Sequence, residues 1–296
     1  MPGTSLIICS RNRPELLVDT VKSVLSGEEV PSEIIIIDQS DLTNPILSAN
    51  EPNPDCEFNY LKTESVGVSK ARNTAIGIAR HNLLIFLDDD MLVTKAWFGS
   101  IVRSLIEAGP HSVVTGKVLP YEKETNQGFA PSTKADDRPT VYKGRIEKDV
   151  LFTNNMAAYR SAFDEVGVFD ERLGPGTPFL AAEDNDLCFR LLEAGYEIIY
   201  EPRAEVYHRA WRSKHEFISM EWNYGYGQGA FYAKHMSLRD PFILRRMGKD
   251  IFNYSARVPF RVWRKFYRAK GDALFALGLM LGAAHWFFSQ RKHAYD

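Results

Sequence analysis

Runs of consecutive aliphatic residues alternate with segments of helical periodicity over the first hundred positions of the chain. The runs within 5–10, 32–41 and 82–91 contain no polar interruption, which predicts strands buried on both faces. Residues 13–27 and 69–81 lie between them and carry apolar side chains at helical spacing. Strands and helices that alternate in this way form largely parallel sheets with right-handed crossovers. The sequence therefore predicts an α/β fold with a largely parallel sheet flanked by helices.

Composition narrows the class of protein. A chain of 296 residues with 45% hydrophobic and 25% charged residues is long enough for one large domain or two modest ones. The net charge of -2 argues against bulk nucleic-acid binding. The three cysteines are far apart and lack C-x-x-C spacing, which argues against a disulfide scaffold and fits a reducing cytoplasm. The N-terminal residues place no basic segment ahead of a long apolar core, so we expect no signal peptide.

Three adjacent carboxylates, Asp88, Asp89 and Asp90, end the strand within 82–91. Asp is poorly suited to strand interiors, and neighbouring carboxylates repel one another. A solvated turn with a helix cap would explain them. The alternative is a divalent cation, because Mg²⁺ and Mn²⁺ prefer oxygen ligands and often bridge to a substrate's phosphates. Asp38 also ends a strand, and functional residues of such sheets gather at the carboxyl ends of strands.

An enzyme that moves a sugar from a nucleotide diphosphate needs a nucleotide pocket, a cation for the departing diphosphate and a carboxylate base. Candidates for these roles occur in chain order. Those for nucleotide and metal binding lie at strand ends, and Asp184 begins a helix beside a Gly/Pro-rich loop. The candidates are Ser10, Arg11, Arg13, Asp38, Asp88, Asp90, Asp184 and His208.

Taken together, these residues resemble the family 2 glycosyltransferases, which have the GT-A fold, a Rossmann-like α/β fold with a mixed sheet flanked by helices. The resemblance covers residues 5–208 and runs in order through "IICSRNRPELLVDTVKSVL", "EIIIIDQSD", "GVSKARNTAIGIARHNLLIFLDDD", "NNMAAYRSAFDEVGVFDE" and "AEDNDLCFRLLEAGYEIIYEPRAEVYH". It implies an inverting transfer from a nucleotide-diphosphate sugar with Mn²⁺ or Mg²⁺ as cofactor. We expect a UDP-sugar, although Arg11 replaces the aromatic residue that the family usually places near the base.

The resemblance also implies roles for individual residues. Asp90, together with His208, is expected to bind the metal, Asp38 and Asp88 to contact the nucleotide, and Asp184 to act as general base. Alone, Asp184 and its neighbour Glu183 would be explained as first-turn charges that stabilise a helix dipole. Arg72 and Asp89 are further candidates on the nucleotide side. On the acceptor side the candidates are Asn155, Gly176, Glu183 and Trp211, with Asp186 expected to brace Arg190 four residues later.

We expect a catalytic domain over 1–215, with a nucleotide-sugar half (1–110) and an acceptor half (111–215), and a helical C-terminal extension over 216–296. The acceptor, a glycan, polysaccharide or lipid-linked intermediate, would be held by loops such as 121–140 and 209–230. The aromatic residues of 221–232 could stack on a sugar or a lipid, or they could pack internally.

The C-terminal eighty residues change in character. Residues 255–270 place cations at helical spacing between apolar residues, which predicts one basic amphipathic helix. The apolar run 273–288 would span only ~24 Å as a helix, less than the ~30 Å core of a bilayer. Its Gly278 and Gly282 form a G-x-x-x-G pattern typical of close helix packing. We therefore expect peripheral attachment to anionic lipid of the cytoplasmic leaflet, with a buried helix of the catalytic domain as the alternative.

Two other classes of protein compete with a glycosyltransferase. A catalytically inactive relative that serves as a binding or scaffold protein would not need Asp90, Asp184 and His208 intact. A sugar nucleotidyltransferase also binds nucleotide and Mg²⁺, but that class resembles chains with a glycine-rich loop after the first strand. The corresponding segment here, "CSRNRPE", contains no glycine.

Overall fold

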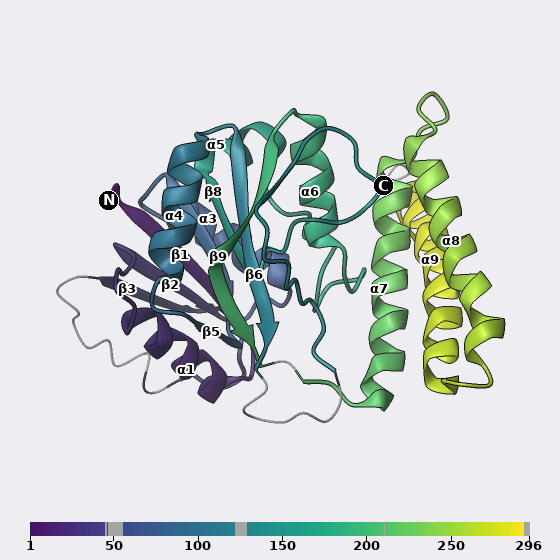
Figure 1. The fold of residues 1–296 in the computed structure, drawn as a ribbon, viewed down its shortest axis with the longest axis horizontal. Coiled ribbons are helices and arrows are strands. Elements are labelled where there is room, and N and C mark those ends of the chain that lie inside the picture. Colours follow the sequence, from purple (N-terminus) through teal and green to yellow (C-terminus); the bar gives the residue numbers. More distant parts are fainter. Residues whose placement is uncertain (45, 47–55, 122–128, 210, 293–296) are drawn as a thin grey trace. The chain divides into compact units, whose positions relative to one another are not determined.

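The computed structural model describes residues 1–292 except 45, 47–55, 122–128 and 210 (Figure 1). Contacts divide the chain into two compact units. The first comprises 1–126, 130–169 and 187–211, and the second 127–129, 170–186 and 212–296. The main segment of the second unit begins near the predicted boundary at 215. The segment 170–186, which we had assigned to the catalytic domain, groups with the C-terminal helices.

The first unit is built on one mixed sheet, nine-stranded within the described residues, in the order β3-β2-β1-β4-β8-β6-β9-β5, with β7 pairing β9 (Figure 1). Strands β2, β1 and β4 are parallel, and β8 is antiparallel to both β4 and β6. Because β9 is parallel to β6, it also runs in the direction of β4. The strands are β1 (Thr4–Ser10), β2 (Glu33–Asp38), β3 (Glu57–Lys62), β4 (Leu83–Asp88), β5 (Met91–Val93), β6 (Ser112–Pro120), β7 (Thr140–Tyr142), β8 (Asn155–Tyr159) and β9 (Glu197–His208).

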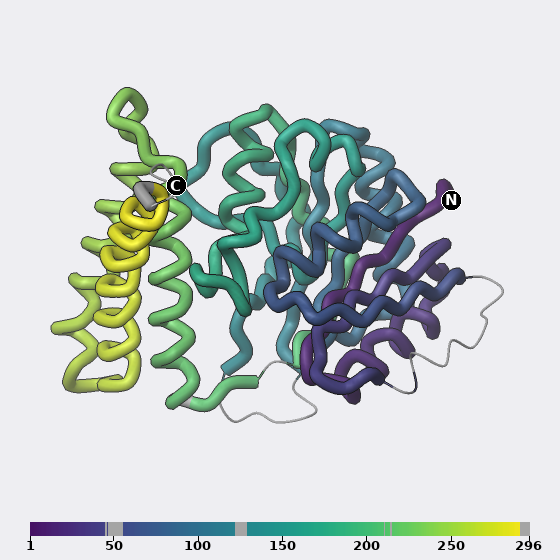
Figure 2. The backbone as a smooth tube through the Cα atoms, turned by 180° about the vertical axis from the view of Figure 1, so that it is seen from behind, coloured from purple at the N-terminus to yellow at the C-terminus, as the bar shows by residue number. Residues whose placement is uncertain are grey.

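Helices cover both faces of this sheet, as the uninterrupted aliphatic runs predicted. In β1, Leu6 and Ile8 join one core cluster and Ile7 joins the other, because side chains alternate across a strand. Helices α1 (Pro14–Leu25) and α4 (Trp97–Ala108) bury their apolar faces in the first cluster. Helices α3 (Val68–Ile78) and α5 (Arg160–Val166) contribute to the second, as does the later part of α6 (Glu183–Glu193). Figure 2, which views the molecule from behind, shows α3 in the foreground. The structure confirms the α/β prediction.

The second unit contains helices α7 (Lys214–His235), α8 (Phe242–Arg261) and α9 (Phe266–Lys292), which lie side by side (Figure 2). Helix α7 begins with a capping box in which Ser213 and Glu216 exchange side-chain to backbone hydrogen bonds. It occupies most of 209–230, so the prediction of an acceptor loop there was wrong. The other expected acceptor loop, 121–140, lies partly outside the described residues, because 122–128 are not among them. The aromatic segment 221–232 forms part of this helix, where Phe231 and Tyr232 are fully buried.

Glycines bring α7 and α9 into close contact. A Cβ added at Gly229 would overlap the carbonyl oxygen of Leu279, and one at Gly282 would overlap that of Tyr226. A Cβ at Gly278 would lie 2.9 Å from the Trp222 carbonyl oxygen. The G-x-x-x-G pattern therefore serves packing within this chain. Judged by length and composition alone, the helical segment 266–290 could cross a membrane. Half of this apolar stretch, however, is buried inside the protein.

The predicted basic helix over 255–270 is wrong as a single element. Helix α8 ends at Arg261 and α9 begins at Phe266, so a turn divides the segment. Pro259 removes one backbone hydrogen bond just before this end. The Arg261 guanidinium then pairs with Asp272 of α9, at 2.9 Å and 2.8 Å from its two carboxylate oxygens. This pair holds the chain in a reversal that charge spacing alone does not reveal.

Candidate active site

The predicted nucleotide and metal residues meet at the carboxyl edge of the sheet. Ser10 pairs in register with Asp38, and Cys9 pairs with Asp88. His208 ends β9, which runs in the same direction. The short strand β5 follows the acidic triplet and pairs antiparallel with β9, so that Met91 lies opposite His208. This pairing brings Asp90 beside His208, although 118 positions separate them in the sequence.

Asp90 and His208 form the most metal-like pair of this edge. Both side chains are buried, and the Nε2 atom of His208 lies 3.4 Å from Oδ1 of Asp90. The other ring nitrogen, Nδ1, is 3.1 Å from the carbonyl oxygen of Pro131, to which it donates in the Nε2-acceptor tautomer. Burial lowers the pKa of His208, but the hydrogen bond and charge of Asp90 outweigh burial and raise it above 6.5.

The donor atoms of this pair fit a hard or borderline cation. Two ligands at about 2.1 Å from one octahedral ion lie about 3 Å apart when they are neighbours, close to the observed separation. Within the described residues, no group of three or more His, Cys, Asp or Glu side chains forms a metal site by itself. Mg²⁺ is commonly held by one or two protein ligands plus substrate phosphates and water, so two protein ligands fit such a site.

Asp89 is buried beside this pair. Its Oδ2 accepts a hydrogen bond of 2.6 Å from Ser10, and its backbone carbonyl accepts one of 2.8 Å from Thr20. Burial, reinforced by the charge of Asp90, raises the pKa of Asp89 to about 7. The Arg13 guanidinium bridges Oδ1 of Asp89 at 3.1 Å and Oδ2 of Asp90 at 2.9 Å. Ser10, Arg13 and Asp89 thus brace the acidic turn, and direct nucleotide contacts by them stay a prediction.

Asp88 is oriented by a buried arginine. The Nη2 atom of Arg72 donates to Oδ1 of Asp88 at 3.1 Å, and the guanidinium lies 5.2 Å from the ring centre of Phe169. Arg72 is almost entirely buried, whereas the Asp88 side chain is 37% exposed. The partly exposed carboxylate of Asp88 is accessible to a ligand while Arg72 fixes its orientation. The arrangement therefore fits Asp88 as the nucleotide contact and Arg72 as the residue that supports it.

Asp38 is buried and anchored by a residue that we did not predict. The Tyr60 hydroxyl on β3 donates to Oδ2 of Asp38, and the Ser40 amide donates to Oδ1 at 2.9 Å. Burial, and after it the hydrogen bond to Asp38, raise the pKa of Tyr60 to about 12. No local sequence signal links two residues 22 positions apart. Arg11 is exposed on the loop after β1.

Asp184 belongs to the second unit, in the first turn of α6. It is partly buried, and Glu183 beside it is buried. The preceding residue, Ala182, has a left-handed backbone with φ of 76°, which is uncommon for a residue with a Cβ. Strain of this kind is maintained only where surrounding contacts hold it. The expected acceptor residue Gly176 is exposed and also left-handed, with φ of 80°.

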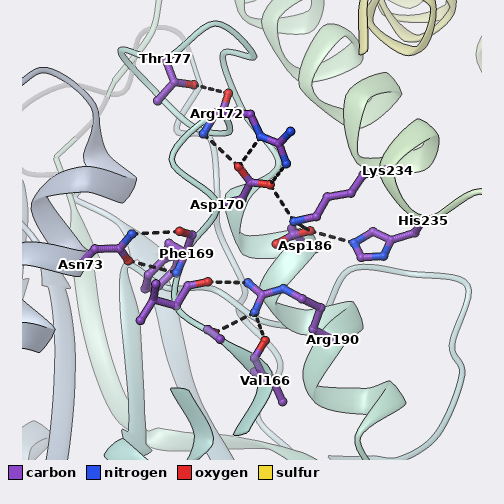
Figure 3. Close-up of polar contacts among 12 residues, drawn as sticks. Asn73, Val166, Phe169, Asp170, Arg172, Thr177, Asp186, Arg190, Lys234 and His235 are labelled. Carbon is purple, nitrogen blue, oxygen red and sulfur yellow. Dashed lines mark hydrogen bonds and ion pairs between the residues drawn. The ribbon is translucent and has the colours of Figure 1, made fainter. Parts of the chain in front are cut away.

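Asp186, in the same first turn, is fully buried and held by Lys234 and His235 from the end of α7 (Figure 3). Its Oδ1 lies 2.7 Å from Nζ of Lys234 and 2.8 Å from Nε2 of His235. Lys234 also contacts Asp170 at 2.8 Å. Arg190, the partner expected from i+4 spacing, donates to the backbone carbonyls of 166–168. This network ties the helix turn that carries Asp184 to α7.

Two acceptor-side predictions differ in outcome. Asn155 is fully buried, and its amide accepts from Nε1 of Trp97 at 2.9 Å and donates to the carbonyl of Ala204 at 2.9 Å and to that of Lys117 at 3.2 Å. The expected acceptor contact is therefore wrong for Asn155, because Trp97 of α4 and two carbonyls of the sheet already use its polar atoms. Trp211 is partly exposed, and its indole donates to the Tyr121 carbonyl at 2.9 Å, which leaves its acceptor role a prediction.

Comparison with solved structures places the fold among glycosyltransferases. The mannosyltransferase PcManGT from Pyrobaculum calidifontis, in complex with GDP-Man and Mn²⁺, is similar with a TM-score of 0.64 and 15% identity, over 96% of this chain and 87% of that chain. TarS of S. aureus in complex with UDP-GlcNAc is similar with a TM-score of 0.56 and 16% identity, over 94% and 90%. These neighbours confirm the predicted GT-A fold.

Sequence comparison identifies the family. The pre-mycofactocin glycosyltransferase of Mycobacterium tuberculosis is 25% identical over 222 residues, 71% of this chain. The chain spans only 44% of that relative's length. The sequence profile of Glycosyl transferase family 2 matches residues 5–167, more than half of the chain. The chain therefore belongs to glycosyltransferase family 2.

Proposed function

We propose that this protein is an inverting glycosyltransferase that moves a sugar from a nucleotide diphosphate to a hydroxyl acceptor. The observation that carries the proposal is the buried Asp90–His208 pair, with 3.4 Å between Oδ1 and Nε2, at the same sheet edge as Asp38 and Asp88. Carboxylates and an imidazole at the carboxyl ends of strands supply nucleotide contacts and metal ligands together.

The proposed donor is a UDP-sugar, with Asp38 and Asp88 on the nucleotide side. Neighbouring structures hold either UDP-GlcNAc or GDP-Man, and the exposed Arg11 is the residue that we expect to distinguish bases. Asp90 and His208 would hold Mn²⁺ or Mg²⁺. When bound, such an ion would neutralise charge on the departing diphosphate.

Asp184 is the proposed general base. Its carboxylate would accept the proton of the acceptor hydroxyl while that oxygen forms a bond to the anomeric carbon. The bond from this carbon to the diphosphate oxygen breaks on the opposite face, and the nucleoside diphosphate leaves with the electron pair. A single displacement of this kind inverts the configuration at the anomeric carbon. The proposal rests on the position of Asp184 in the first turn of α6, a turn anchored through Asp186.

The proposed acceptor is a glycan or a lipid-linked intermediate. We propose that the enzyme works on the cytoplasmic side, in peripheral contact with an anionic membrane. A water-soluble donor and a membrane-bound acceptor would then meet at the surface where the enzyme is attached.

The test is donor binding and turnover with defined metals. A thermal-shift screen of nucleotide sugars with Mn²⁺ should show one class that raises the melting temperature, since ligand binding stabilises the folded state. The Asp90→Ala variant should lose metal-dependent donor hydrolysis and transfer, and His208→Ala should weaken them or change the preferred metal. The exposed Glu107→Gln on α4 serves as control.

Full activity of the parent in excess EDTA would refute the metal assignment. Donor binding without hydrolysis or transfer to any acceptor would indicate an inactive relative that serves as a binding protein. Release of inorganic diphosphate from a nucleoside triphosphate and a sugar phosphate would indicate a nucleotidyltransferase.

A further inference from the structure

We propose that the turn joining α8 and α9 inserts its aromatic side chains into the interface of an anionic lipid bilayer. We call residues 257–268 the hairpin tip. The inference identifies the surface responsible for the membrane contact proposed above, and it rests on that part of the proposed function alone.

The first observation is the exposure of large apolar side chains at the hairpin tip. Trp263 is 93% exposed, Phe260 80% and Phe266 67%. Single exposed apolar residues are ordinary, but three aromatic residues within seven positions form a cluster whose exposure to water is unfavourable. Trp in particular is enriched at the level of lipid headgroups, where one side of its ring is apolar and the other meets water.

The second observation is charge. Residues 251–271 contain no acidic side chain, and the exposed cations of the hairpin tip are Arg257, Arg264, Lys265 and Arg268. Cations interleaved with exposed aromatic side chains are the composition of elements that lie in the interface of anionic membranes. A neutral apolar partner would gain nothing from this charge.

The third observation is rigidity. The Arg261–Asp272 ion pair joins the two helices at the tip, and Asp272 is buried. Further from the tip, the rings of Tyr254 on α8 and Phe275 on α9 stack with 3.8 Å between their centres. The aromatic cluster is therefore presented on a fixed support, and less conformational entropy is lost when it binds.

A second copy of the chain is the competing occupant. A two-fold symmetric contact places the same patch on both subunits. Pairing of two hairpin tips would bring Arg264 and Lys265 of both copies together, with no acidic residue in 251–271 to compensate. Anionic headgroups remove this repulsion, which favours the bilayer.

The test is co-sedimentation of the full chain with vesicles. Phosphatidylcholine vesicles containing phosphatidylserine should pellet the protein at low salt, and pure phosphatidylcholine vesicles or high salt should release most of it. Trp263→Ala should lower the vesicle partition coefficient about tenfold, and the double variant Arg264→Gln and Lys265→Gln should lower it by a similar factor. Leu238→Ala is the matched control, because Leu238 is 94% exposed and lies in the loop between α7 and α8.

Vesicle binding that is unchanged by Trp263→Ala and by the double variant would overturn the proposal, and so would a full chain that ignores anionic vesicles. A concentration-dependent dimer that Trp263→Ala dissociates would assign the tip to a second copy instead. Donor binding and hydrolysis are measured without vesicles and should be the same in all four proteins. Absence of donor hydrolysis in the parent would refute the proposed catalysis. Absence of vesicle binding alone would refute only the proposed membrane contact of the hairpin tip.

Discussion

The Asp186→Asn substitution tests whether the buried ion cluster holds the first turn of α6 in place. Asn has nearly the same shape as Asp, so the change removes charge with little change in volume. Asp186 is fully buried, and its Oδ1 contacts Lys234 at 2.7 Å and His235 at 2.8 Å. After the substitution, the ammonium of Lys234 and the imidazole of His235 face an uncharged amide inside the protein.

The expected loss of stability follows from these contacts. Removing one partner of a buried ion pair costs about 3–5 kcal/mol when the other charge is left uncompensated. Lys234 keeps a second carboxylate, Asp170, at 2.8 Å, so its charge stays partly balanced. We therefore expect a loss of about 2–4 kcal/mol in the free energy of unfolding, somewhat below the cost of leaving a buried charge fully uncompensated.

Urea unfolding followed by circular dichroism would measure this loss as a lower midpoint with an unchanged slope. A double-mutant cycle with Lys234→Gln should give a favourable coupling energy between the two side chains. Glu193→Gln, at the other end of α6, is the matched control. Its carboxylate pairs with Arg145 at 2.6 Å near the surface, and such pairs contribute about 0–1 kcal/mol. An Asp186→Asn variant no less stable than this control would refute the reasoning.

Asp184→Asn should leave donor affinity nearly intact and slow transfer by ~10²–10⁴-fold, the scale of general-base catalysis, and near-parent transfer rates would exclude Asp184 as the base. Burial and a neighbouring carboxylate raise the pKa of Glu221 from 4.5 to about 7, so its stabilising contribution is present below pH 4.5 and lost as the pH rises through 7. Glu221→Gln should therefore be as stable as the parent near pH 4.5 and more stable above pH 7, by about 1–2 kcal/mol after solvent screening. Thermal melts in which the two proteins keep the same difference in stability at both pH values would contradict this. Gly282→Ala should lower the free energy of unfolding by about 2–3 kcal/mol, because the new methyl group would overlap the Tyr226 carbonyl. Gly248→Ala, where the new methyl group would meet no atom within 4 Å, should stabilise the protein slightly, and equal effects of the two substitutions would refute close packing of α7 on α9.

Local patterns in the sequence were sufficient for much of the first unit. The four isoleucines that end one residue before Asp38 are fully buried in β2, as an uninterrupted apolar run requires when helices cover both faces of a sheet. Placement of Asp38 and Asp88 at one edge follows from the parallel order of their strands. These features depend on neighbouring residues in the chain, so periodicity reveals them.

Partners distant in sequence were not visible in this way. Nothing near Asp89 indicates that Ser10 and Arg13 would hold it, or that Tyr60 would hold Asp38. Asn155 was an expected acceptor contact, yet hydrogen bonds with Trp97 of α4 and with two carbonyls of the sheet occupy its amide. Which polar side chain faces a ligand and which one supports it depends on strand pairing, and pairing is a property of the folded chain.

The C-terminal region shows the same division most clearly. Charge spacing over 255–270 is that of one helix, although Pro259 lies within the segment. The chain reverses there because α9 gains more by packing its glycines against α7, and by joining Arg261 to Asp272, than by extending α8 into water. Sequence alone determined that these residues would be basic, aromatic and helical. Tertiary packing decided that they form a turn with Trp263 exposed at its end, because the contacts that stabilise the reversal come from other helices.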